Sequence, residues 1–192
     1  MMLETDRLIL RPWKESDAKN LYEYAKSPLI GPMCGWPAHI SVEDSHGSIV
    51  RVLSNPEHYV VVLKAEEKLV GSISLSVGDQ SSLDIPDDED EIGYWAGEPY
   101  WGQGLIPEAV KDLLKYGFVE LGLKKIWCTY FEGNIKSKRV QEKCGFIYQH
   151  TKENEPRPLM NDFVTKHVNC LTCVEWQKSK VIEDNNLRLQ KL

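Results

Sequence analysis

The sequence predicts a single α/β or α+β domain in which helices cover a central sheet. Short β-rich runs alternate with amphipathic helical segments, in the expected order β-α-α-β-β-β-α-β-α-β-β. The 192 residues and their hydrophobic content of 42% are ordinary for one globular domain with a substantial core. We therefore expect one domain over residues 1–177 and a polar tail over residues 178–192, which frays or forms a loose helix.

The first half of the chain shows alternating apolar residues, then two helices with capping residues, then two β-rich runs. Serine is a common N-cap residue, and proline marks the ends of both helices. The expected elements are a strand over Thr5–Trp13, a helix from Ser16 to near Pro28, a loop GPMCGWPAHIS, a helix from Ser41 to Leu53, and a hairpin of YVVVLK and LVGSISLSV joined by AEEK.

The second half begins with the acidic run DIPDDEDE (84–91), which is typical of a solvated loop. The apolar residues after the glycine-rich stretch at 102–104 recur at helical spacing, and Gly122 is a natural helix stop. The expected elements are a strand IGYWAG, a helix over Pro107–Leu121 with Pro107 as its first residue, a strand Lys125–Phe131, a helix from Asn134 to Lys143, and the strands FIYQH and FVTKHVNCLTCVEW.

Charge and cysteine content exclude several function classes. A formal net charge of −6 argues against a nucleic-acid binder. The five cysteines are odd in number, and Cys170 and Cys173 fall on opposite faces of an expected strand, so reduced thiols are favoured over zinc. The histidines show no ligand spacing, so no metal is expected. Early charge disfavours a signal peptide, and no apolar run has the length of a membrane span. We expect a cytoplasmic protein without a membrane partner.

The stretch EPYWGQGLIPEA (98–109) places two glycines at the mouth of a helix. A Walker loop requires GK[ST] after its glycines, which is absent here. A Rossmann fingerprint requires a third glycine where Pro107 stands. Two interpretations stay open from this stretch alone: bare backbone amides that bind an anion, and a glycine turn that only caps the helix.

The wider context resembles a known family. YWGQGLIPEAVKDLLKYGFVELGLKKI followed by NIKSKRVQEKCGF is similar to the acetyl-CoA-binding core of the GNAT N-acetyltransferases, in their RimJ/RimL-type ribosomal-protein N-acetyltransferase-like branch. The opening ETDRLILRPWKESDA, the EIGYW strand and the late strand also match, so the resemblance covers roughly residues 3–177. Ile106 departs from the small residue that the family has at that position. The family's Q/R-x-x-G-x-G/A signature falls on Trp101, Gly102, Gln103, Gly104, Leu105 and Ile106.

This resemblance implies a GNAT-like fold: one mixed, mostly antiparallel sheet flanked by helices, with two strands splayed at the cofactor site. It implies acetyl-CoA as cosubstrate, no metal, and acetyl transfer to a primary amine of a protein N-terminus, peptide or small molecule by direct attack in a ternary complex. The alternatives are a non-catalytic acyl-CoA-binding or sensing module and a nucleotide-binding α/β protein. The oligomeric state is open, with a homodimer as one alternative because homodimers are common among similar proteins.

The resemblance also implies catalytic roles. Glu91 is the candidate general base, with a solvated loop residue as its structural alternative. Ser137 is the candidate donor to the departing sulfur, and Tyr130 is the alternative. Asn134 caps its helix and contacts the pantetheine arm, and Trp36 lines the acceptor pocket.

The implied cofactor contacts fall into three groups. Backbone groups of Tyr94, Trp95 and Ala96 bind pantetheine, and one N–H there stabilises the developing oxyanion. The signature residues 101–106 close around the pyrophosphate. Lys143, together with Arg139, either meets the adenosine phosphates or is an exposed helix charge.

Overall fold

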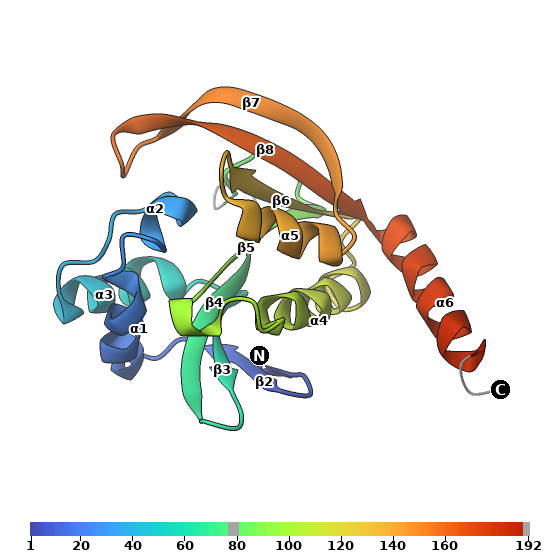
Figure 1. Cartoon of the computed structure of the whole chain (residues 1–192), viewed down its shortest axis with the longest axis horizontal. Helices are drawn as coiled ribbons and strands as arrows, with labels where there is room; N and C mark the ends of the chain where they lie inside the picture. The colour runs from blue at the N-terminus through green and yellow to red at the C-terminus, as the bar shows by residue number, and fades with distance from the viewer. Residues whose placement is uncertain (77–80, 190–192) are drawn as a thin grey trace.

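The computed structural model describes residues 1–76 and 81–189, with side chains up to residue 182 (Figure 1). Val77 of the expected hairpin and residues 190–192 of the expected tail lie outside this part. The strands are β1 Leu3–Glu4, β2 Leu8–Pro12, β3 His58–Leu63, β4 Lys68–Ser76, β5 Glu89–Ala96, β6 Lys125–Phe131, β7 Ile147–Arg157 and β8 Asp162–Thr172. The α-helices are α1 Ala18–Ala25, α2 Gly31–Cys34, α3 Val42–Ser48, α4 Leu105–Val119, α5 Ile135–Lys143 and α6 Cys173–Leu189.

The described strands form one sheet in the order β1-β2-β3-β4-β5-β6-β8-β7. Neighbours are antiparallel except β5 and β6, which are parallel. These two strands pair only where Glu89–Glu91 face Lys125–Trp127, and beyond those residues they separate. The expected mixed, mostly antiparallel sheet with a splay between these two strands is confirmed.

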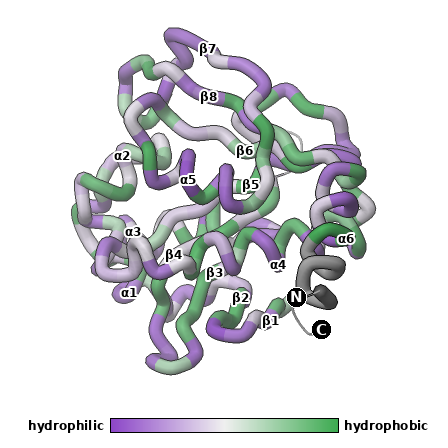
Figure 2. Tube along the Cα trace, turned by 45° about the vertical axis from the view of Figure 1, so that its right-hand side comes forward, coloured by the Kyte–Doolittle hydropathy of each residue, from purple (hydrophilic) through white to green (hydrophobic). Residues whose placement is uncertain are grey.

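Helices cover both faces of the sheet, as the alternating side chains of β5 show. The Tyr94 hydroxyl contacts α5, while the ring of the next residue, Trp95, lies 6.4 Å from the ring of Tyr24 in α1. Helix α4 buries its apolar side, including Leu113 and Leu114, against the same face as α5. Hydrophobic segments gather in the central strands and along α4, whereas much of β7 is hydrophilic (Figure 2).

Several local expectations are confirmed. The Ser41 hydroxyl accepts a hydrogen bond from the Asp44 backbone N–H (3.2 Å) and caps α3, which continues as a π-type turn to Leu53. Strands β3 and β4 form the expected hairpin. Asn134 caps α5 through its side-chain oxygen, which accepts from the Ser137 N–H at 3.2 Å.

The expected helix starts in the N-terminal part and at the glycine stretch were wrong. Ser16 is not a cap: it lies inside a short 3₁₀ turn, Glu15–Asp17, in which the Asp17 carboxylate accepts from the Lys14 N–H. The Gly- and Pro-rich loop contains the one-turn helix α2. Helix α4 begins at Leu105, so Pro107 is its third residue rather than its first.

The acidic run and the C-terminal region also differ from expectation. Glu89–Glu91 are buried members of β5 rather than solvated loop residues. Strand β8 ends at Thr172, and Cys173 starts α6, so the CxxC spans a strand–helix boundary. Helix α6 extends away from the rest of the molecule (Figure 1), anchored near its start by Trp176, whose ring lies 5.5 Å from that of Phe118.

Candidate active site

A cavity of about 680 Å³ lies where β5 and β6 separate. Its walls come from four parts of the chain: the segment around α2, the end of β5, the start of α4, and α5 with the residues before it. The lining residues are Leu29, Ile30, Met33, Cys34, Tyr94, Trp95, Ala96, Tyr100, Trp101, Gly102, Gly104, Leu105, Ile106, Pro107, Gly133, Asn134, Ile135, Lys136, Ser137, Arg139, Val140 and Lys143. Most of the residues expected at the site therefore surround one space, except Gln103, Glu91 and Trp36.

The glycine turn leaves backbone donors free at one end of this cavity. Gly102 and Gly104 have φ angles of 78° and 75°, in the left-handed region that favours glycine. Gly104 is the N-cap of α4 and has no side chain with which to cap it. The N–H groups of Leu105 and Ile106 therefore have no side-chain cap, and Pro107 has no N–H. The helix start is thus a site where an anion could accept hydrogen bonds.

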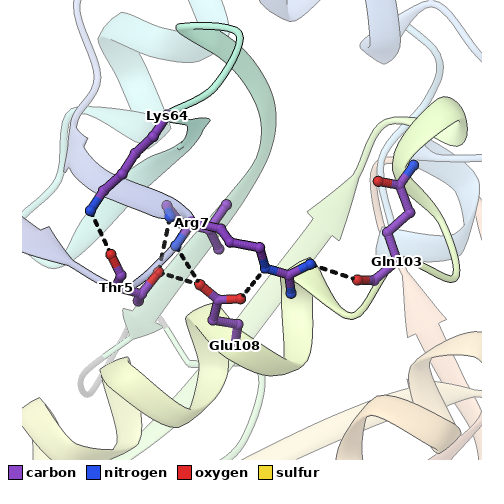
Figure 3. A network of polar contacts seen from close by, with 6 residues as sticks. Thr5, Arg7, Lys64, Gln103 and Glu108 are labelled. Atoms are coloured by element: carbon purple, nitrogen blue, oxygen red, sulfur yellow. Dashed lines mark hydrogen bonds and ion pairs between the residues drawn. The ribbon is translucent and has the colours of Figure 1, made fainter.

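A polar network braces the glycine turn from behind (Figure 3). The Arg7 guanidinium donates to the Gln103 carbonyl oxygen (3.1 Å) and to the Glu108 carboxylate (2.6 Å), which also accepts from the Thr5 hydroxyl (2.5 Å). The Gln103 side chain turns away and donates to the Pro99 carbonyl oxygen (2.8 Å). The network ties the turn to the residues between β1 and β2, and sequence reasoning missed it because about a hundred residues separate the partners.

Three cations of α5 line the cavity. Lys136, Arg139 and Lys143 are spaced i, i+3 and i+7, which places them on one side of the helix. The Lys136 ammonium lies 3.6 Å from the centre of the Trp101 ring. Arg139 and Lys143 were expected here, and Lys136 was missed although the same helical spacing points to it. The three charges would favour phosphate groups.

Two hydroxyl groups meet on the wall of the cavity. Ser137, in the first turn of α5, places Oγ 3.1 Å from the Tyr94 hydroxyl oxygen. Burial raises the pKa of Tyr94 well above its ordinary value, so its hydroxyl stays protonated. Tyr130, the alternative donor, is not among the lining residues, and its ring lies 4.7 Å from that of His167. Tyr94 was expected to act only through its backbone, and its hydroxyl is the group that sequence reasoning missed.

Glu91 lies on the opposite face of β5 from Tyr94 and is 8% exposed. Its carboxylate accepts four hydrogen bonds: from the Ser81 hydroxyl (3.0 Å), the Ser82 N–H (2.6 Å) and hydroxyl (2.9 Å), and the Thr129 hydroxyl (2.9 Å). It does not line the cavity. Its role as a base remains a prediction.

Trp36 also lies outside the lining residues. Trp36 is half-buried, and its ring lies 5.1 Å from that of His39. Gly31 packs closely against the Trp36 ring, because a Cβ on Gly31 would lie within 2.6 Å of the ring. Its predicted place in the acceptor pocket remains a prediction. The segment that does reach the cavity from this side is α2 with the residues before it, through Leu29 and Met33.

Within residues 1–76 and 81–189, no group of three or more histidine, cysteine or acidic side chains is arranged to hold a metal ion. No helix in this part of the chain combines the length and the apolar character needed to cross a membrane.

The splayed parallel strands, the uncapped start of α4 and the cations of α5 are the arrangement that an acyltransferase using a nucleotide-linked thioester requires. The acetyltransferase (GNAT) domain model matches residues 7–147, and the chain belongs to the GNAT acetyltransferase family. The uncharacterized N-acetyltransferase YnaD of Bacillus subtilis is 30% identical over 149 residues, which covers 76% of this chain and 82% of YnaD.

Solved structures show the same fold. The ribosomal-protein-S5-alanine acetyltransferase of Vibrio fischeri matches with a TM-score of 0.74 and 20% identity, covering 92% of this chain and 98% of that one. The microcin C7 self-immunity acetyltransferase MccE, solved with acetyl-CoA and AMP, matches with a TM-score of 0.70 and 20% identity, covering 88% and 93%. The resemblance to the family, with relatives of the RimJ/RimL type, is confirmed, and the protein is an acetyltransferase.

Proposed function

We propose that the protein transfers the acetyl group of acetyl-CoA directly to a primary amine, with both substrates bound together at the β5–β6 splay. The observation that carries this proposal is the coincidence, in one cavity, of the open edge of β5, the uncapped start of α4 and the Ser137–Tyr94 hydroxyl pair. A thioester supplies an activated carbonyl and a good leaving group. The chain has to hold it, orient the amine and manage two protons.

The residues present fit coenzyme A. Nothing lies within 4 Å of a Cβ built on Gly102, and one on Gly104 would approach only the end of the Arg7 side chain, at 3.7 Å. A pyrophosphate could therefore come close to the backbone at the turn, while Lys143 and Arg139 offer charge to the remaining phosphate. The backbone groups of Tyr94–Ala96 that do not bond to β4 have no partner on β6 and could bind the pantetheine amides, apart from the Ala96 carbonyl oxygen, which accepts from Trp101 Nε1 (2.8 Å).

The two proton transfers of the reaction would take place on opposite faces of β5. On the α5 face, the Ser137 hydroxyl would donate to the departing sulfur, with Tyr94 beside it. On the opposite face, Glu91 would take the amine proton through a water molecule, because it does not line the cavity, and this water would replace one of the four hydrogen bonds that the carboxylate accepts. One backbone N–H of residues 94–96 would stabilise the oxyanion, and Asn134 would contact the pantetheine arm.

The acceptor is proposed to enter beside α2. The Asn134 side chain donates to the Met33 carbonyl oxygen (3.4 Å) and Arg157 donates to that of Pro32 (2.6 Å), so α2 is held from two sides. The Vibrio fischeri relative is named for an alanine of ribosomal protein S5, which makes protein N-termini one class to test. Because Glu89–Glu91 are buried, only the part of the acidic run before Glu89 could help to attract a basic acceptor.

The test is an assay of thiol release from acetyl-CoA against a panel of basic peptides, peptide N-termini and small amines, with mass detection of the product. We expect turnover with at least one class of primary amine and an acetyl mass shift on that amine. Tight CoA binding without turnover on any acceptor would contradict direct transfer to an amine and favour a binding module. If ATP or NAD raised the thermal stability of the protein and CoA did not, the assignment of acetyl-CoA as cosubstrate would be wrong.

A further inference from the structure

Behind the cavity wall, α5 carries a buried glutamine. Gln141 is fully buried on a helix whose other residues are half-buried or exposed. Its side-chain nitrogen Nε2 lies 3.1 Å from the Thr129 carbonyl oxygen in β6 and 3.2 Å from Ser137 Oγ. Its oxygen Oε1 lies 2.6 Å from Asn169 Nδ2 in β8. Because a buried amide without partners is costly, these contacts fix the position of the side chain.

The partners of Gln141 also fix which way its amide faces. The Thr129 carbonyl oxygen can only accept a hydrogen bond, so the amide nitrogen has to face it. The Asn169 NH₂ group donates to Oε1, which is consistent with the same orientation. One hydrogen of Gln141 Nε2 is thus committed to β6 and the other points at Ser137 Oγ.

The orientation of the Gln141 amide determines how the Ser137 hydroxyl can donate. Its oxygen accepts from Gln141, so its single hydrogen is free to be donated elsewhere. The next polar neighbour is the Tyr94 hydroxyl oxygen at 3.1 Å, and the Tyr94 hydrogen has its own acceptor in the Ser137 backbone carbonyl at 3.2 Å. Donation therefore runs from Asn169 through Gln141 to Ser137 and ends at two residues that line the cavity.

We propose that Gln141, oriented by Asn169, is a positioning residue for acetyl transfer: it donates to Ser137 from behind, so that the serine hydrogen stays available on the cavity side, for the Tyr94 hydroxyl in the free protein and for the departing sulfur during transfer. As the carbon–sulfur bond breaks, its electron pair remains on sulfur, and the serine would stabilise that charge by hydrogen bonding. This inference rests on the proposed role of Ser137. It adds a residue that never touches either substrate.

The first experiment compares Gln141→Met with Ser137→Ala and with the double variant. Methionine keeps the length and volume of glutamine but cannot donate. We expect Gln141→Met to lower kcat about tenfold, the size of one lost hydrogen bond, with the KM for acetyl-CoA unchanged within about twofold. In the Ser137→Ala background the same change should cost no further kcat, because the group through which it acts is gone. Gln149→Met, at an exposed glutamine of β7, is the matched control and should behave as wild type.

The second experiment is the pH profile of Gln141→Glu. A carboxylate at this position accepts rather than donates, so it would draw the serine hydrogen away from the cavity, and protonation would relieve this. We expect kcat of this variant to fall as the pH rises through the titration of the new carboxyl group, while the wild type shows no matching loss. A merely structural role would lower thermal stability without this titration.

Three outcomes decide between the claims. If Ser137→Ala loses activity but Gln141→Met and Gln141→Glu keep wild-type kcat well below their melting temperatures, the positioning role is wrong and the role of Ser137 stands. If the Gln141→Met loss persists in full without Ser137, the glutamine does not act through the serine. If Ser137→Ala keeps full kcat, the role of Ser137 fails and this inference fails with it, although acetyl transfer itself can still be measured.

Discussion

The hydroxyl groups of Tyr94 and Ser137 lie 3.1 Å apart on the wall of the cavity, brought together from β5 and α5. Either hydroxyl group has a hydrogen to donate to a departing thiolate, but their surroundings differ. Tyr94 is held with a pKa well above its ordinary value by burial, whereas Ser137 receives a donor from Gln141. The pair is therefore the first target for mutation.

Ser137→Ala should lower kcat by about 10²-fold, at the low end for general acid catalysis because a thiolate is already a fair leaving group. CoA affinity should change much less, since one neutral hydroxyl is lost from a large contact area. Tyr94→Phe should lower kcat by only about fivefold, the effect of one hydrogen bond. Steady-state kinetics with CoA titration measures both. If Tyr94→Phe lost more kcat than Ser137→Ala, the donor to the departing sulfur would be Tyr94 and not Ser137.

Gly104→Glu should abolish measurable CoA binding while leaving most of the fold intact. The side chain would place a carboxylate at the mouth of α4, where the pyrophosphate is expected, and like charges repel. The matched control is Gly122→Glu: Gly122 has a similar φ of 70° and nothing within 4 Å of a Cβ, but it does not line the cavity. Both variants should lose a similar amount of stability from backbone strain, about 1–2 kcal/mol. Calorimetric titration with CoA separates them, and unchanged affinity in Gly104→Glu would refute the phosphate site.

Arg7→Met should weaken CoA binding about fivefold, the size of one lost hydrogen bond, by releasing the Gln103 carbonyl oxygen from its brace. Arg11→Met is a suitable control, because Arg11 forms its ion pair with Asp17 (2.7 Å) and neither residue lines the cavity. That control should affect stability but not CoA affinity. Equal affinity losses in the two variants would show that the brace has no specific effect on the turn.

Asp90→Asn should stabilise the protein at neutral pH. Burial, with a smaller contribution from the charge of Glu57, raises the pKa of Asp90 from 3.8 to about 6. Below pH ~4 the Asp90 carboxyl group is protonated in both the folded and the unfolded protein, so it costs no stability. As the pH rises toward 6 and above, the unfolded protein ionises this group more easily than the folded protein, and stability is lost. At pH 7.5 the substitution should gain up to about 3 kcal/mol.

Urea unfolding at pH 4 and pH 7.5 checks this prediction, and the gain should vanish at the lower pH. Asp87→Asn, at an exposed position of the same acidic run, is the control and should show little change at either pH. A gain from Asp90→Asn that is equal at both pH values would contradict the titration of this carboxyl group.

The sequence was most informative where function depends on local backbone geometry. The splay between strands was implied by the resemblance to the family, whereas the glycines at 102 and 104 and the cap Asn134 predicted the turn and the start of α5 from local patterns. These features are set within a few residues, so their patterns can be read without a fold. The exact start of α4 was less accessible, because a proline is tolerated anywhere in the first turn of a helix.

Contacts between distant segments were not predictable. The fixed position of Glu91 depends on Ser81 and Thr129, and the role proposed for Gln141 depends on Asn169. The length of β7 was missed for the same reason: its polar residues carry little strand signal, and the pairing with β8 overrides their preference. Pairing across the sheet is information that no short window of sequence holds.

Strands β5 and β6 pair through only three residue pairs, and this short seam affects how the two parts of the sheet can move relative to each other. On one side of this seam lie β1 to β5, and on the other lie β6, β8 and β7. Two such units can fluctuate partly independently, since few backbone hydrogen bonds join them. A ligand that bridges the seam would couple them into one cooperative unit. Amide hydrogen exchange should then slow on both sides when CoA binds, in strands that never touch it.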